Sequence, residues 1–484
     1  MHTELMAQLS LIYPELMIAL GALALLMMGV FIGARSYALI SVLSIVLLCA
    51  TIIVTLVFAR DGIFIRDTLI MDSFGRYMKV LTLIGAIFAL IMSIGFAKTE
   101  KFDKFEFPIL TLLATLGMMF MISAGNMLSL YMGLELQSLA LYVLAAINRD
   151  NVRSSEAGLK YFVLGALSSG MLLYGISLIY GFTGQIGFSN IATMLDGQIP
   201  QLGIIFGMVF VLAGIAFKIS VVPFHMWTPD VYEGAPTPIT AFFAVAPKIA
   251  AMALLIRVIV DAFLPLNGVE GVMPAWQQIL VFMAIASMIL GAFAGIGQHN
   301  IKRLMAYSSI THMGYALVGL AAGSMIGVQS VIIYMTIYVA MTLGCFAFIL
   351  GMRTQEGTVE NIYDLGGLAK TNPFMAVIMT IQLFSLSSIP PMAGFFGKWY
   401  TFSAAVHAGL VPLTVIGMIA SVVGAYYYLR MIKIMWFDEV KVNFKALSFE
   451  IKFILALSGV FVLFYVLFGS YIFNLAESAA ASLF

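Results

Sequence analysis

Four ionisable side chains lie inside long apolar stretches of this sequence, where an isolated charge is unfavourable. They are Glu135 in MGLELQSLALYVLAAI, Lys218 in KISVVPFHMW, Lys248 in FFAVAPKIA and Lys398 in FFGKW. A charged side chain near the middle of a bilayer costs about 2.5–3.5 kcal/mol, so four of them oppose insertion by roughly 10 kcal/mol. Such groups must pair with one another or face water inside a helix bundle.

The chemistry that these residues can perform is proton transfer between ammonium and carboxylate groups. A lysine in water has a pKa of about 10.4 and keeps its proton at pH 7. Burial lowers the pKa of a lysine by up to about 3–5 units, whereas a nearby carboxylate raises it again. A buried lysine with a movable carboxylate partner is therefore a proton switch. We expect Glu135 and Lys218 to form such a pair.

Hydroxyl and imidazole groups lie on two further apolar segments and offer a path between these charges. They are Tyr307, Ser308, Ser309, Thr311, His312, Tyr315, Tyr334, Thr336 and Tyr338. Ordinary hydrogen bonds between helices explain most of them equally well. His312 can titrate near neutrality as a relay or make a static hydrogen bond. His225 follows a proline and can serve either proton uptake or the capping of free carbonyls.

No pattern predicts a metal or cofactor site in this chain. Cys49 and Cys345 are far apart, no CxxC occurs, and both cysteines are expected to pack as small hydrophobic residues. A haem between His299 and His312 would need partners from His2, His225 or His407, which lie on different segments. No GxGxxG follows a strand, and neither a Walker sequence nor HExxH is present.

The composition restricts the elements that position these residues to membrane helices. Of 484 residues, 62% are hydrophobic and 10% are charged, against about 25% charged in soluble domains. The net charge of +1 argues against a nucleic-acid partner. The first apolar stretch lacks a basic region before it and is predicted to be a retained span. We predict an all-α polytopic membrane protein with about fourteen spans: 11–33, 37–58, 77–97, 108–124, 126–147, 158–182, 203–230, 237–258, 275–297, 303–323, 327–352, 374–404, 408–433 and 452–474.

The distribution of basic residues predicts how the chain is oriented, because cytoplasmic loops carry the excess of Lys and Arg. The loops after odd-numbered spans hold sixteen: Arg35, Lys98, Lys101, Lys104, Arg149, Arg153, Lys160, Lys302, Arg303, Arg353, Lys370, Arg430, Lys433, Lys441, Lys445 and Lys452. The opposite side holds five: Arg60, Arg66, Arg76, Lys79 and Arg257. We therefore expect both termini on the periplasmic side.

Two of the predicted spans are interrupted by proline. Pro223 breaks the seventh span, and Pro390 with Pro391 breaks the twelfth. A proline inside a helix removes one donor and frees carbonyl groups. At membrane depth such a backbone persists only where it is buried in protein or lines a wet cavity. Breaks at matching positions of two halves are a sequence signal for a transport path.

Spans 4–8 and 9–13 are predicted to be two copies of one five-helix unit. The matching residues are Asn126 and Asn300, Tyr142 and Tyr315, and Trp227 and Trp399. A unit with an odd number of spans inserts upside down the second time, so the repeats are inverted. The expected segments are an N-terminal three-helix part (1–107), the first repeat (108–258), the inverted second repeat (259–433) and a C-terminal loop with the last helix (434–484).

The stretches KISVVPFHMWTPDVYEGAPTPITAFFAVAPKIA, MGLELQSLALYVLAAI and IPPMAGFFGKW resemble the antiporter-like membrane subunits of respiratory complex I (NADH–quinone oxidoreductase). The similarity extends over essentially the whole chain. Within the family it is closest to the subunit N type. Lys398 stands where subunit M usually has glutamate, and the chain ends at Phe484, where subunit L normally continues into a lateral helix.

The resemblance implies a proton-translocating subunit with discontinuous helices 7 and 12. It assigns the helix-5 and helix-7 charges to Glu135 and Lys218, the central link to Lys248, and exchange with the far side to Lys398. It implies other membrane subunits of complex I, antiporter-like and small, as partners in the bacterial inner membrane. NADH, FMN, iron–sulfur clusters and quinone are expected on those partner subunits, with no cofactor in this chain.

Two other functions remain open from the sequence. Subunits of multisubunit proton/cation antiporters share this ancestry and the same lysines, although sodium prefers clustered oxygen ligands and Glu135 is the one central carboxylate. A structural spacer without transport is the third possibility, and four costly buried charges argue against it. Inhibitor-sensitive NADH oxidation in membranes with and without the chain separates the first two functions.

Overall fold

Helices account for nearly all of the computed structural model, which describes residues 8–33, 36–58, 60–65, 67–100, 102–197, 201–266 and 273–484. Of the residues considered above, His2, Arg35, Arg66 and Lys101 lie outside these ranges. The helices of the N-terminal part are α2 (Tyr13–Ile32), α3 (Tyr37–Val57) and α4 (Ser73–Thr99). Between α3 and α4, strands β1 (Gly62–Phe64) and β2 (Leu69–Met71) form a small antiparallel hairpin.

The remaining elements follow in the order α5 (Glu106–Ser123), α6 (Met127–Ala145), α7 (Val152–Thr183), α8 (Phe188–Leu195), α9 (Leu202–Ile219), α10 (Trp227–Gly234), α11 (Thr237–Arg257), the π-helix η2 (Val258–Phe263), α12 (Ala275–Ile296), α13 (Ile301–Ala321), α14 (Met325–Gly351), the 3₁₀-helix η3 (Ile362–Leu365), α15 (Leu368–Thr371), α16 (Pro373–Leu386), α17 (Ala393–His407), α18 (Val411–Phe437) and α19 (Phe449–Ala481).

Among the described residues, twelve helices are long and apolar enough to cross a membrane. The other two of the fourteen predicted spans correspond to α13 and to the pair α16 and α17. Helix α13 carries the row of hydroxyl, tyrosine and histidine residues, which lowers its hydropathy. Helices α16 and α17 are separated by the predicted proline break, so neither half has the length of a span by itself. That all fourteen segments cross the bilayer stays a prediction.

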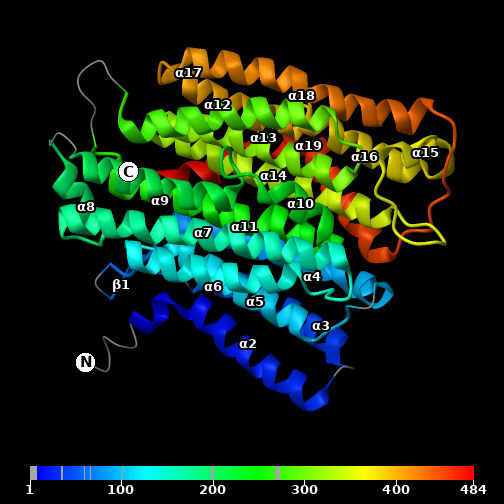
Figure 1. Cartoon of the computed structure of the whole chain (residues 1–484), viewed down its shortest axis with the longest axis horizontal. Coiled ribbons are helices and arrows are strands. Elements are labelled where there is room, and N and C mark those ends of the chain that lie inside the picture. The colour runs from blue at the N-terminus through cyan, green and yellow to red at the C-terminus, as the bar shows by residue number, and fades with distance from the viewer. Residues whose placement is uncertain are drawn as a thin grey trace.

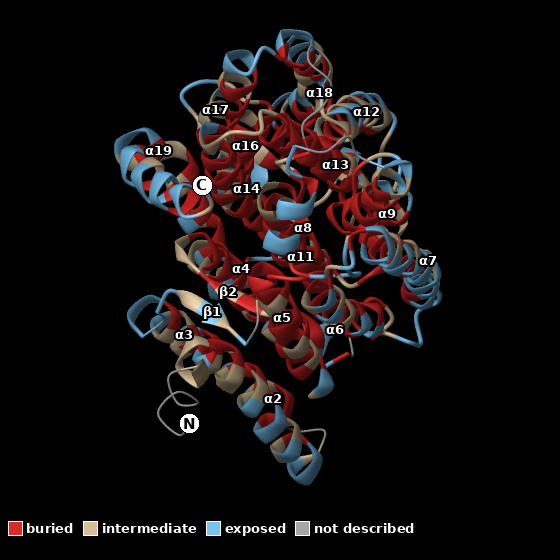
Figure 2. Ribbon diagram, turned by 90° about the vertical axis from the view of Figure 1, so that its left-hand side faces the viewer, coloured by how far each residue is buried: buried red, intermediate tan, exposed pale blue. Residues whose placement is uncertain are grey.

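The helices lie roughly parallel to one another, with α2 at one end of the molecule and α18 at the other (Figure 1). Helix α11 is buried along its whole length and forms the centre, and the outward faces of α2, α7, α18 and α19 are exposed (Figure 2). These exposed faces are apolar, as expected for surfaces that meet lipid or neighbouring subunits. Cys345 is buried as predicted, but Cys49 lies on the exposed side of α3, so its predicted burial was wrong.

Both predicted helix breaks are present, and they have the same local structure. The first separates α9 from α10, and the second separates α16 from α17. In each, one serine that follows the first half-helix, Ser220 or Ser388, adopts a left-handed φ of 63°. The next N–H then donates to the carbonyl five residues earlier, at 3.1 Å in the first break and 2.9 Å in the second. Matching breaks of this kind support the predicted repeat.

The starts of α6 and α13 also match. The side chains of Asn126 and Asn300 accept hydrogen bonds from the second and third N–H groups of these helices. Each asparagine also forms an isolated antiparallel bridge, Asn126 with Gly187 and Asn300 with Asn361. The separation in sequence between Asn126 and Asn300 equals that between their bridge partners, Gly187 and Asn361. The asparagine pair predicted from the sequence thus occupies equivalent positions.

Loss of the Asn126 cap is expected to destabilise the protein modestly. The Oδ1 atom of Asn126 accepts from the N–H of Leu128 at 3.1 Å and of Ser129 at 2.8 Å. Replacing a capping side chain by alanine costs about 1 kcal/mol, so Asn126→Ala should lower the thermal denaturation midpoint in detergent. Asn126→Ser keeps a side-chain acceptor, so its denaturation midpoint should stay close to that of the parent. Equal midpoints for the Ala and Ser variants would contradict a capping role.

Candidate functional site

Lys218 lies in the last turn of α9, directly before the first break. Its side chain is 3% exposed and donates hydrogen bonds to two residues of α6, Ser138 Oγ at 2.7 Å and Tyr142 Oη at 3.2 Å. The break places a helix C-terminus inside the protein, and the negative end of the helix dipole favours a cation there. The interrupted helix therefore holds an ammonium group where a continuous span would offer only apolar side chains.

The predicted ion pair between Glu135 and Lys218 is not formed. Among the described residues, no ion pair within 4.0 Å involves Glu135, and its Oε1 atom has no hydrogen-bond partner. Glu135 lies one helical turn before Ser138 on the same side of α6. The ammonium group of Lys218 therefore contacts α6 one turn further along the chain than the carboxylate. Glu135 borders a stripe of exposed apolar residues: Leu128, Met132, Leu139 and Val143. The sequence placed both residues correctly on their helices, but it could not define the register of α9 against α6.

Lys248 is fully buried in the middle of α11. Its ammonium group donates to Ser309 Oγ on α13, and Ser309 Oγ in turn lies 2.7 Å from Tyr338 Oη on α14. The ammonium group also lies 5.5 Å from the ring centroid of Tyr232, within the distance of a cation–π interaction. Lys248 is thus satisfied by neutral partners and begins a connected row of hydroxyl groups.

His312 on α13 is the centre of a second hydrogen-bonded group, and its ring lies 6.0 Å from that of Tyr338. Its Nδ1 lies 2.6 Å from Tyr334 Oη and its Nε2 lies 3.2 Å from Tyr428 Oη, which is hydrogen-bonded to Ser308. A neutral imidazole has one donor and one acceptor nitrogen, so one tyrosine donates to the ring while the other accepts from it. This arrangement can exchange a proton from one side of the ring to the other. The relay residue predicted from the sequence therefore lies in the row, with tyrosine partners on two other helices.

Lys398 ends the row in the first half of α17. Its side chain is 6% exposed, donates to Ser421 Oγ of α18 at 2.6 Å, and lies 4.2 Å from the ring centroid of Tyr315. The ring of Tyr315 packs edge-on against His312, with centroids 5.7 Å apart. A cavity of about 610 Å³ beside the second break is lined by Ser388, Lys398 and Ser421. Lys398 thus joins the inner row to an opening at the end of the molecule that α17 and α18 form.

Hydroxyl groups also occupy the region between Lys218 and Lys248. In the part of the chain that the structure describes, Thr228 Oγ1 and Tyr232 Oη are buried and have no hydrogen-bond partner. Both lie on α10, which directly follows the break after Lys218. Buried polar groups generally acquire a protein or water partner. Of the two residues, Tyr232 lies beside the second lysine, since the Lys248 ammonium group is 5.5 Å from its ring centroid.

His225 lies in the non-helical link between α9 and α10, where the sequence placed it. It is half-buried, and its Nδ1 has no hydrogen-bond partner among the described residues. It is therefore not tied into the row around His312. Both predicted roles, proton uptake and capping of free carbonyls, stay open for this residue.

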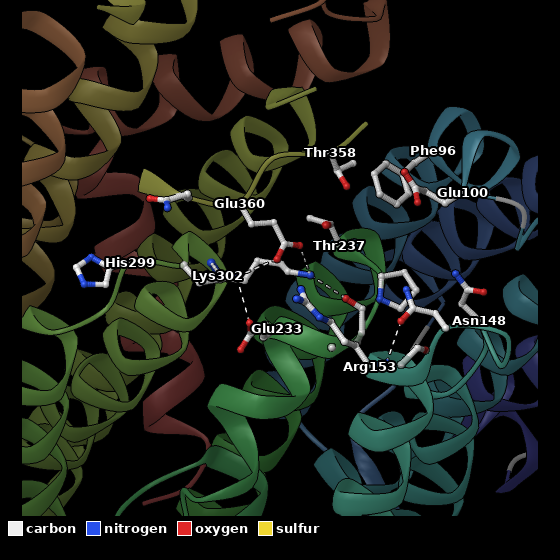
Figure 3. A pocket seen from close by; sticks show the side chains of 17 residues that line it. Phe96, Glu100, Asn148, Arg153, Glu233, Thr237, His299, Lys302, Thr358 and Glu360 are labelled. Carbon is white, nitrogen blue, oxygen red and sulfur yellow. Dashed lines mark hydrogen bonds and ion pairs between the residues drawn. The ribbon is translucent and has the colours of Figure 1, made fainter. Parts of the chain in front are cut away.

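A charged vestibule at the other end of α10 was not predicted. Lys302 Nζ contacts Glu360 at 2.7 Å and the carbonyl of Ala235 at 3.1 Å, on the wall of a cavity of about 490 Å³ (Figure 3). A neighbouring cavity of about 220 Å³ is lined by ion pairs of Arg303 with Asp230 at 2.7 Å and Glu233 at 2.9 Å. The acidic residues stand in the quoted block TPDVYEG, but their basic partners come from distant helices, so the sequence showed no pairing.

Three basic residues of the orientation count, Lys79, Arg257 and Lys302, are buried in ion pairs. Lys79 contacts Glu15 at 2.5 Å, with side chains 3% and 1% exposed. Arg257 contacts Asp72 at 2.9 Å and Asp261 at 3.2 Å. Their acidic partners neutralise them inside the protein, so they carry little weight in an argument about loop charges. Without these three residues the basic side chains still divide unevenly between the two sides, and the orientation stays a prediction.

Known proteins resemble this chain over its full length. Residues 124–424 match the family described as NADH:quinone oxidoreductase/Mrp antiporter, TM. A relative from Bartonella bacilliformis, named NADH-quinone oxidoreductase subunit N, is 72% identical over 484 residues, covering 100% of this chain and 99% of the relative. A chain of respiratory complex I from Thermus thermophilus superposes with a TM-score of 0.82 at 29% identity, covering 96% of this chain and 99% of that one. A chain of the Mrp complex from Dietzia sp. also has a TM-score of 0.82, at 22% identity and 97% coverage of each, which shows a shared fold.

Proposed function

Because the chain belongs to the family of membrane subunits shared by NADH:quinone oxidoreductase and Mrp antiporters, we propose that its buried lysines carry protons across the membrane. The chain is a proton-translocating, multi-pass subunit of NADH-quinone oxidoreductase in the bacterial inner membrane. In the proposed mechanism, Lys218, Lys248 and Lys398 accept and release protons in sequence.

The observation that carries this proposal is the proximity of two hydrogen-bonded groups: Lys248 is linked through Ser309 to Tyr338, and the ring of Tyr338 lies 6.0 Å from that of His312. Lys248 is fully buried and has no acidic partner within 4.0 Å among the described residues. A permanently charged lysine in such a place is costly, whereas the neutral amine that remains after the proton has left the protein interior is not. Burial without a counter-charge therefore favours proton transfer over a structural ion pair.

The remaining residues receive roles from their positions. Lys218 takes up a proton beside the first break. Glu135, which lies on α6 one helical turn before the Lys218 partner Ser138, modulates the proton affinity of Lys218. His312 passes the proton between Tyr334 and Tyr428, and Lys398 delivers it to the cavity beside the second break. The charged vestibule around Lys302 lies at the uptake side in this scheme, with His225 at the first break as a further uptake group.

The two halves of the chain contribute equivalent parts to this path. In the first, Lys218 lies 5.3 Å from the ring centroid of Tyr142, and in the second, Lys398 lies 4.2 Å from that of Tyr315. Lys218 lies on the half-helix before the first break and Lys398 on the half-helix after the second, and each donates to a serine. We propose on this basis that 108–258 and 259–433 are inverted repeats, flanked by 1–107 and 434–484. Both termini lie on the periplasmic side in this arrangement.

The driving reaction belongs to other subunits in this proposal. NADH, FMN, the iron–sulfur clusters and quinone bind to partner subunits, and this chain contributes the translocase step without a redox centre. Other membrane subunits of the complex are its partners. The exposed apolar stripe of α6 that borders Glu135 is a suitable contact for one of them, since a partner there would enclose the carboxylate.

A test of the modulating role replaces Glu135 by glutamine in the assembled complex. We expect NADH-driven proton translocation to fall, because the neutral amide no longer changes the charge balance near Lys218. Glu135→Asp, which keeps a carboxylate, should retain more activity. The measurement is proton uptake or release per NADH oxidised in membrane vesicles. Unaltered translocation in a fully assembled Glu135→Gln complex would rule out this role.

A further inference from the structure

A groove on the outer surface of the molecule is formed by α4, α14 and α19, and it contains none of the lysines of the proposed path. Its floor is one face of α14, and its walls are α4 and α19. The lining residues are Leu81, Ile84, Phe88, Thr336, Val339, Ala340, Leu343, Ile454, Leu457, Ser458 and Phe461. They enclose a cavity of about 250 Å³. Helix α19 lies at the edge of the molecule beside α14 and α4, with its outer face exposed (Figure 2).

A second cavity of about 170 Å³ continues the groove along the same three helices. On α4 its lining extends from Ile91 to Phe96, and on α19 it reaches back to Ile451. From Leu81 to Phe96 the groove follows α4 for about 22 Å, at 1.5 Å per residue. One leaflet of a bilayer has a hydrocarbon thickness of about 15 Å. The groove thus has the length of one leaflet with its headgroup region.

The two parts of the groove differ in polarity. In the inner part the polar atoms are already used within the protein, since Ser458 Oγ donates to the carbonyl of Ala340 at 2.6 Å and accepts from Gln382 at 2.6 Å. Thr336 Oγ1 likewise donates to the carbonyl of Ile332 at 2.9 Å. A molecule bound in this part therefore contacts an apolar surface. Cavities of this size admit an acyl chain but not an α-helix, which is about 10–12 Å in diameter.

The outer part of the groove ends at two cations. Arg353 and Lys445 both line it, and the backbone N–H of Lys445 donates to the carbonyl of Arg353 at 2.7 Å, which holds the two residues together. The guanidinium of Arg353 makes no side-chain hydrogen bond to a described residue, and the carboxylate of Glu100 lies 3.7 Å away. Glu450 also lines this end, so that with Glu100 two carboxylates stand beside the two cations, and Lys445 has no ion pair among the described residues. Arginine suits the two-oxygen geometry of a phosphate.

We propose that this groove binds one anionic phospholipid. Its acyl chain lies along α14 between α4 and α19, and its phosphate lies between Arg353 and Lys445. The apolar floor suits the acyl region of such a molecule, and the basic end suits its phosphate. The groove also has the length that the molecule occupies in one leaflet. An uncharged helix from a partner would leave Lys445 without a counter-charge, and a free anion would leave the apolar part unused. Juxtamembrane basic residues attract anionic headgroups.

The test uses the assembled complex in nanodiscs that contain phosphatidylglycerol with a photoactivatable diazirine in its acyl chain. Crosslinked peptides are then mapped by mass spectrometry. We expect labels on 81–88, 336–343 or 454–461 of this chain. The double variant Arg353→Gln, Lys445→Gln should reduce this labelling by at least about fivefold, since the headgroup loses its basic partners. The matched control is Lys370→Gln, an exposed lysine away from the groove, which should not change it.

Three outcomes would overturn the proposal. They are equal labelling by a phosphatidylcholine analogue, unchanged labelling of the double variant, and crosslinks that show another subunit seated in the groove. A second variant, Ala340→Phe, fills the floor without changing any charge. It should abolish labelling at 336–343 while the complex stays assembled and oxidises NADH. Persistent labelling there would also contradict the proposed position of the acyl chain.

Discussion

Replacing Lys248 by methionine is expected to stop most of the proton flow through this chain. The side chain is fully buried, and its ammonium group is the first member of the row that continues through Ser309 and Tyr338. Methionine fills a similar volume but cannot carry a proton. A barrier increase of about 1.4 kcal/mol already slows a step tenfold, so a missing proton carrier should lower the flux by at least about tenfold. The measurement is NADH-driven acidification in vesicles that contain the assembled complex.

Lys248→Arg is the informative control for this experiment. Arginine keeps the positive charge but does not release its proton in proteins. If the site works by proton exchange, the arginine variant assembles and still fails to pump. Restored pumping by Lys248→Arg would show that charge alone suffices, and full stoichiometry in Lys248→Met would remove Lys248 from the path.

Replacing Arg257 by methionine is expected to cause the largest loss of stability. The guanidinium is 1% exposed and connects Asp72, Asp261 and the carbonyl of Ile122, at distances between 2.9 and 3.2 Å. These contacts join the start of α4, the end of α5 and the π-helix after α11. Removing one member of a buried ion pair costs about 3–5 kcal/mol, because the other charge stays buried without a partner. The expected result is a lower denaturation midpoint of the complex and less assembled enzyme.

A second substitution separates this charge effect from lost packing. Asp72 caps α4 by accepting from the N–H of Gly75 at 2.6 Å, and serine can replace it as a cap without its charge. The double variant Arg257→Met, Asp72→Ser should therefore recover part of the stability lost in Arg257→Met. If both variants are equally unstable, the uncompensated carboxylate is not the cause. The denaturation midpoint of Arg257→Lys should lie between those of the parent and Arg257→Met, since lysine keeps the charge but not the forked set of guanidinium donors.

The breaks in the seventh and twelfth helices were predictable because they depend on local chemistry. Pro223 and Pro390 each remove a backbone donor in the middle of an apolar segment, and the chain shows non-helical links at both places, although Pro247 lies inside the continuous helix α11. The capping asparagines, Asn126 and Asn300, are local signals of the same kind. The burial of Lys248 and Lys398 also followed from their position inside apolar segments. These features require only neighbouring residues and the length of a span.

The partners of the charged residues were not predictable in the same way. The ion pair between Glu135 and Lys218 was expected because both are central charges, but the lysine reaches Ser138 and Tyr142 instead. A difference of one helical turn between two packed helices decides this contact. Lys79 and Arg257 were counted only as charges on one side of the membrane, whereas the structure pairs them with Glu15 on α2 and with Asp72, the cap of α4, both remote in the sequence.

The sequence by itself determined that the chain is a bundle of membrane helices, where two of them break, and which few charges the membrane must accommodate. These properties arise from hydrophobicity and backbone geometry within one segment. Only the tertiary structure decided that Lys248, His312 and Lys398 share one row, that Glu135 stands apart at the edge, and that two cations meet an apolar groove beside α19. Such contacts depend on the rotation and register of helices against each other, which many weak packing interactions set together.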